Sequence, residues 1–204
     1  MKVSHHIRFL HKALIAAIGL LFCPSVAAAH LVTTGMGPVY DGIGHLLLTP
    51  EDLVPALAMA LYAGLRGRAP GRRALFFFPF AWLLGGLLGL FANTMPIFPV
   101  TAFSFLLLGI FIASDLRLPD HAFTVLAAAV GILHGLLNGI ALKAGPAGLG
   151  LLGIMSALFV LVAIVSAIVV SLKPPWTRIV VRVAGSWVAA MGLLMIGWFF
   201  RVQG

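Results

Sequence analysis

Six apolar stretches, each close to the length of a bilayer crossing, constrain the fold of this 204-residue chain more than any other feature. A transmembrane helix needs about 20 mostly apolar residues. Hydrophobic residues make up 62% of the sequence, charged residues 9%, and the mean hydropathy is +1.14. This composition excludes an ordinary soluble domain. We predict an all-α, polytopic transmembrane helix bundle whose six spans cover residues 40–66, 74–92, 97–114, 121–142, 149–172 and 178–200.

The first 29 residues have the three parts of a secretory signal peptide: a basic start, an apolar centre and a small-residue cleavage site before His30. The apolar centre, residues 13–22, is short for a membrane crossing, which favours a cleaved signal over an uncleaved first span. Cleavage would leave a transmembrane domain of residues 30–204.

Lysine and arginine gather at the ends of the apolar stretches, as topology signals do. If the loop 66–73 is cytoplasmic, eight of the ten basic residues beyond position 29 lie inside. We therefore predict a protein of the bacterial inner membrane, with the mature N- and C-termini on the periplasmic side. The net charge of +8 then reflects topology, and we expect no nucleic-acid partner.

A polar cluster interrupts the first span, where Asp41, His45, Glu51 and Asp52 stand among apolar residues. An ionisable group at bilayer depth costs several kcal/mol unless it is paired, hydrated or bound to an ion. The order threonine, proline, acid, acid at 49–52 is typical of a helix start. We therefore predict a first span that breaks and starts again, with an ion site at the break.

Each member of this cluster also has a structural alternative. Glu51 and Asp52 could serve only the free amides and the dipole of a helix start, and Asp41 could be solvated at the outer membrane face. His45 has no acidic or basic neighbour in sequence, which favours a role in ion binding.

The fourth span carries a second polar pair, His134 and Asn138, one helical turn apart. Glycines at 131, 135 and 139 form a stripe beside them, so both side chains should face a neighbouring helix. The alternative is a polar pair that only joins helices by hydrogen bonds. Imidazole and carboxylate ligands together suit nickel, cobalt, zinc, copper or iron.

An intramembrane serine protease is a weaker interpretation. Ser156 and His134 lie on different spans, but Ile154 stands where the nucleophile of that class normally has a glycine two residues earlier. We predict that the chain is not an enzyme and that it holds no cofactor.

The first cluster resembles a motif of the HupE/UreJ family, H-P-x-x-G-x-D-H. Residues 45–52, HLLLTPED, have the same length. His45 matches the first histidine, Glu51 stands at the aspartate position, and Asp52 replaces the last histidine.

The fourth-span motif of that family, H-G-x-x-H-G, resembles residues 134–139, HGLLNG, where Asn138 replaces the second histidine. The resemblance implies six spans after a signal peptide and a nickel or cobalt permease linked to hydrogenase and urease accessory systems. Two of the four motif histidines are replaced by oxygen ligands, which favours nickel less and admits cobalt, manganese or iron more readily.

These observations predict an inner-membrane permease for a divalent transition metal of the nickel or cobalt class. Its metal ligands would be Asp41, His45, Glu51, Asp52, His134 and Asn138. The alternative is a non-transporting membrane subunit that delivers or senses metal for hydrogenase or urease maturation proteins. Its expected partners are the metal ion, the lipid bilayer and such maturation proteins.

Overall fold

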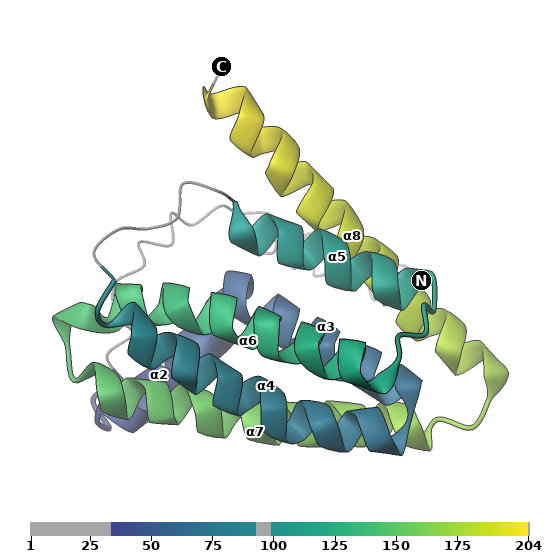
Figure 1. Cartoon of the computed structure of the whole chain (residues 1–204), viewed down its shortest axis with the longest axis horizontal. Coiled ribbons are helices and arrows are strands. Elements are labelled where there is room, and N and C mark those ends of the chain that lie inside the picture. Colours follow the sequence, from purple (N-terminus) through teal and green to yellow (C-terminus); the bar gives the residue numbers. More distant parts are fainter. Residues whose placement is uncertain (1–33, 93–98, 204) are drawn as a thin grey trace, which may run out of the picture. The chain divides into compact units, whose positions relative to one another are not determined.

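The computed structural model describes residues 34–92 and 99–203, and every regular element in these ranges is a helix (Figure 1). The predicted all-α class is confirmed for this part of the chain. The predicted signal peptide, residues 1–29, and His30 lie outside it. The helices are α2 (Pro38–Leu48), α3 (Pro50–Arg66), α4 (Arg68–Gly89), α5 (Val100–Ala113), α6 (Asp120–Ala141), the 3-10 turn η1 (Leu142–Ala144), α7 (Ala147–Ser171) and α8 (Pro175–Gln203).

The predicted break in the first span is confirmed. α2 and α3 meet at Thr49 with a bend of 78°. Thr49 is extended, with φ −101° and ψ 100°, as expected of a residue that precedes proline. Pro50 begins α3 because the first turn of a helix needs no amide hydrogen from it. The Thr49 side chain makes no capping hydrogen bond.

Three of the described helices, α6, α7 and α8, are long and apolar enough to cross a membrane, and the bent α2–α3 pair counts as a fourth. α5 is apolar but has only 14 residues. α4 has 22 residues, but it begins with three arginines, at 68, 72 and 73, and does not meet the same criterion. Length and composition therefore support three or four spans directly, and the count of six stays a prediction.

Glycines bring α4 and α6 into close contact, as the spacing predicts. A Cβ atom at Gly131 would lie 2.7 Å from the carbonyl oxygen of Phe78, and one at Gly135 would collide with the backbone of Trp82. Such small-residue contacts replace the hydrophobic effect as the main attraction between helices in lipid. The close approach holds His134, one residue before Gly135, against Trp82 of α4.

α7 packs against α2, α3 and α4, while α8 packs mainly along α5 (Figure 1). The buried core contains large side chains from several of these helices, among them Tyr62, Phe78, Trp82 and Phe123. Most of α8 is exposed, including its apolar residues, which suits a helix with lipid on one side.

Candidate metal-binding site

His134 is the most deeply buried ionisable side chain of the candidate site, with none of its surface exposed. It lies in the second half of α6 and reaches groups from three other helices. Its Nε2 is 2.8 Å from the Ser104 hydroxyl of α5, and its Nδ1 is 3.4 Å from Oδ1 of Asp52 in α3. The Trp82 ring of α4 stacks on the imidazole, with 5.2 Å between ring centroids. These contacts fix the orientation of the imidazole.

Asp52 connects the two histidines that the sequence analysis singled out. Its Oδ1 faces His134, and its Oδ2 lies 3.6 Å from Nε2 of His45 in α2. The Asp52 side chain is 8% exposed and that of His45 is 15% exposed. The broken first span and the fourth predicted span therefore converge on one carboxylate. Asp52 is directed at the histidines, and no hydrogen bond joins its side chain to the free amides of the α3 start in the described residues.

The hydrogen bonds of Ser104 assign the protons on His134. The Ser104 hydroxyl donates its single proton to the carbonyl oxygen of Thr101, 2.8 Å away, so it accepts a hydrogen bond from Nε2–H of His134. In the neutral imidazole, Nδ1 then carries a lone pair that faces Asp52. Two facing acceptors repel each other unless a proton, on either side chain, or a metal ion lies between them.

Asn138 supports the same region from one turn further along α6. Its Nδ2 donates to the backbone carbonyl of His134, at 3.1 Å. Its Oδ1 and the Nε1 of Trp82 are buried without a hydrogen-bond partner in the described part of the chain. Buried polar atoms usually have a partner, so water is expected beside each of them; of the two, only the amide oxygen could bind a metal cation, because the indole N–H is a donor.

Asp41 and Glu51 do not join this cluster. Asp41 accepts two hydrogen bonds from Thr34, one of them from the hydroxyl at 2.7 Å. Glu51 is exposed and lines a groove of about 570 Å³ with residues of α5 and α8, including Thr101 and Met195. Consecutive helix residues point about 100° apart, so Glu51 turns away when Asp52 faces the core.

Within 34–92 and 99–203, no three histidine, cysteine or acidic side chains form a group that could hold a metal ion as they stand. The arrangement instead offers two adjacent positions, His45 with Asp52 and Asp52 with His134. Nitrogen and oxygen ligands about 2.1 Å from one ion stand roughly 3.0 to 3.4 Å apart. The separations of 3.6 Å and 3.4 Å at the two positions are close to that range.

The model of the family described as HupE / UreJ protein matches residues 18–195. The chain belongs to the HupE/UreJ family. It is also similar to Protein HupE of Rhizobium leguminosarum bv. viciae, with 22% identity over 192 residues that cover 91% of this chain and 98% of the relative. No solved structure matches the chain. HupE/UreJ membership and the apolar helices together identify a membrane protein of the hydrogenase and urease accessory type.

Two residues at the centre of this candidate site were not among the predicted ligands. Ser104 lies in a span whose other polar residues are Thr101 and Ser114, and Trp82 lies in an aromatic-rich span. Hydroxyl and indole side chains commonly serve only for packing in membrane helices, so the sequence does not indicate that Ser104 and Trp82 would contact His134. The Gly131–Gly139 stripe, which predicts close contact between α6 and a neighbour, was the only indication that a residue such as Trp82 would reach His134.

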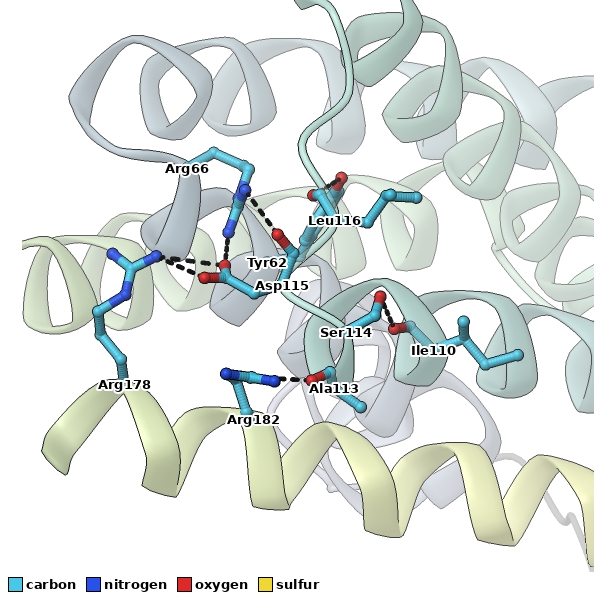
Figure 2. A network of polar contacts seen from close by, with 9 residues as sticks. All are labelled: Tyr62, Arg66, Ile110, Ala113, Ser114, Asp115, Leu116, Arg178 and Arg182. Carbon is cyan, nitrogen blue, oxygen red and sulfur yellow. Dashed lines mark hydrogen bonds and ion pairs between the residues drawn. The ribbon is translucent and has the colours of Figure 1, made fainter.

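A second polar network of the HupE/UreJ chain lies at the far end of α3 from Asp52 (Figure 2). Asp115 forms ion pairs with Arg66 and with Arg178, whose Nη2 is 2.9 Å from Oδ2. Asp115 has a left-handed φ of 54° and ends α5 in a Schellman-type turn, in which the amide of Leu116 bonds the carbonyl of Phe111. We call this region the basic end, after its residues Arg66, Arg68, Arg72, Arg73, Arg117, Lys173, Arg178 and Arg182.

Proposed function

We propose that this HupE/UreJ protein is an inner-membrane permease that passes a divalent transition metal of the nickel or cobalt class into the cell. One observation carries the proposal: a buried carboxylate, Asp52, is shared by two histidines from different helices. Burying these groups inside a membrane protein is costly unless they are paired, hydrated or bound to an ion, and a bound cation would satisfy all three side chains. Imidazole nitrogen with carboxylate oxygen is a ligand set that suits these metals.

The two positions that share Asp52 support stepwise movement of the metal. His45 is the more exposed histidine and would receive the ion first, after Asp41 and Glu51 have attracted it to the outer mouth. The ion would then exchange His45 for His134 while Asp52 stays bound. Water and Asn138, whose Oδ1 is unpaired within the described residues, would complete its coordination. Two weak positions suit transport better than one tight site, because the ion must also leave.

The proposed topology places all six predicted spans in the inner membrane, with α4 and α5 as the second and third. The basic end would face the cytoplasm and the mature termini the periplasm, following the positive-inside rule. The signal peptide, residues 1–29, would be removed before His30. Cysteine accessibility labelling at Lys173 and Arg201, which are predicted to lie on opposite sides, tests this topology.

The rival function is a membrane subunit that delivers or senses metal for a hydrogenase or urease maturation system without transporting it. Membership of the HupE/UreJ family supports either role. The two differ in what the isolated protein does: a permease accumulates metal by itself, whereas a delivery subunit requires its partner.

Uptake of radiolabelled nickel and cobalt into proteoliposomes that contain only this chain tests the proposal. We expect uptake by the native protein and a loss of most of it in His45→Ala. His121→Ala is the matched control, because His121 is an exposed histidine at the start of α6, away from the site. Uptake that is unchanged in His45→Ala contradicts the mechanism, and no uptake of either metal supports the delivery subunit.

A further inference from the structure

A groove of about 440 Å³ lies between the first turns of α4 and the last turns of α7, and none of the candidate metal ligands lines it. Its walls are largely apolar and include Leu75, Ala163, Ala167 and Val170. Arg68 and Arg72 also line it, and four-residue spacing places them on the same face of α4. No carboxylate belongs to this lining.

The arginines of this groove are not neutralised by the ion pairs of the basic end. Asp115 binds Arg66 and Arg178, and Asp120 binds Arg73 with an Nη1–Oδ2 distance of 2.8 Å. Arg68 and Arg72 have no ion pair within the described residues. They stand in the first turns of α4, where the free amides already carry positive partial charge and the first turn contains no acid. An anion bound here would offset this charge.

Ser166 supplies an independent polar group inside the groove. Ser166 is 7% exposed, and its hydroxyl has no hydrogen-bond partner in the described part of the chain; the hydroxyl oxygen is not fully buried, and the residue lines the groove. Helical serines often bond the carbonyl one turn earlier, as Ser156 does with Leu152. A Cβ atom at Gly71 would lie 3.6 Å from the Ser166 hydroxyl oxygen. The free hydroxyl therefore lies beside the α4 backbone at Gly71, a residue between Arg68 and Arg72 in the sequence.

We propose that this groove binds an anionic phospholipid. The phosphate would lie against Arg68 and Arg72, whose guanidinium groups match phosphate oxygens, and Ser166 would donate to an oxygen of the headgroup or ester region. One acyl chain would cover Leu75, Ala163, Ala167 and Val170. Free phosphate offers the same anionic chemistry but would leave this apolar wall uncovered, which favours the lipid. The proposal depends on the membrane location of the chain and not on metal transport.

The test is a titration of the detergent-purified full chain with phosphatidylglycerol and with phosphatidylcholine of identical acyl chains, followed by native mass spectrometry. We expect saturable, tighter binding of phosphatidylglycerol. An arginine near a membrane surface contributes about fivefold in affinity for anionic lipid, so Arg68→Gln with Arg72→Gln should weaken binding about 25-fold. Lys173→Gln, an exposed cation at the same end that does not line the groove, is the one-charge control for each arginine replacement taken singly and should change binding less than about twofold.

A steric variant separates a lipid from a free anion. Ala167→Phe fills the apolar wall at an exposed position without a change of charge, so it should abolish the saturable phosphatidylglycerol site while circular dichroism shows a folded helix bundle. Four results would each overturn the proposal. Two concern the lipid and charge comparisons: equal affinity for the two lipids, or equal losses in Lys173→Gln and the arginine variant. The other two are native-like binding by Ala167→Phe and displacement of the lipid by millimolar inorganic phosphate.

Discussion

Replacement of Asp52 by asparagine distinguishes two states of the contact between Asp52 and His134. The two side chains either form a position that a metal ion can enter or form a permanent buried ion pair. If His134 is neutral, with its single proton on Nε2 toward Ser104, the amide Nδ2 that Asp52→Asn introduces can donate to Nδ1 across the present 3.4 Å gap. A new hydrogen bond is worth about 0.5 to 1.5 kcal/mol, so Asp52→Asn should leave the free energy of unfolding unchanged or raise it by about 1 kcal/mol. If His134 is instead permanently protonated, removal of its partner should cost about 3 to 5 kcal/mol.

The assay is thermal or denaturant-induced unfolding of the purified protein in detergent, combined with nickel and cobalt titration by calorimetry. Metal affinity should fall at least about tenfold in Asp52→Asn, because both positions lose their shared anionic ligand. Asp120→Asn is the control, since its side chain is 66% exposed and pairs with Arg73 away from the site. A large loss of stability in Asp52→Asn with unchanged metal affinity would refute the assignment of Asp52 as a metal ligand.

Three further predictions concern the Ser104 hydrogen bond, the histidine ligands and the contact between α4 and α6. Ser104→Ala should reduce metal uptake into proteoliposomes about 10- to 100-fold, with retained helix content, because His134 loses the partner that orients it; uptake equal to that of the native chain would show that Ser104 only packs. Uptake should fall as the external pH is lowered from about 8 to 5, since protonated imidazole cannot bind metal; a rate that is flat across this range argues against histidine ligands. Gly135→Ala should destabilise the protein by about 1 to 3 kcal/mol or more, because the added methyl group collides with the Trp82 backbone. Gly148→Ala is the control, since a Cβ there meets nothing within 4 Å, and similar unfolding curves for the two variants would contradict the packing.

The features that could be predicted from the sequence are those with a local or periodic cause. The break at Thr49 follows from the stereochemistry of the residue before proline, and the α4–α6 contact follows from glycine spacing. The approach of His45 and His134 was predictable because lipid is a poor environment for both, so they had to face the interior.

The remaining features of the site depend on side-chain directions and on long-range contacts, neither of which produces a recognisable pattern in the sequence. Asp41 bonds Thr34, seven residues earlier, across a turn that the sequence does not specify. Glu51 and Asp52 were predicted to act together, but their positions on α3 send one to the surface and the other to the core. Ser104 orients His134 from a helix 30 residues away in sequence, and its hydroxyl is indistinguishable from a packing residue in the sequence.

Location of the metal in cobalt-loaded protein by anomalous X-ray diffraction tests the central claim most directly. We expect an anomalous peak within about 2.5 Å of an Asp52 carboxylate oxygen and of a ring nitrogen of His45 or His134. A cobalt peak bound elsewhere, with the three side chains free of metal, would contradict the proposed site.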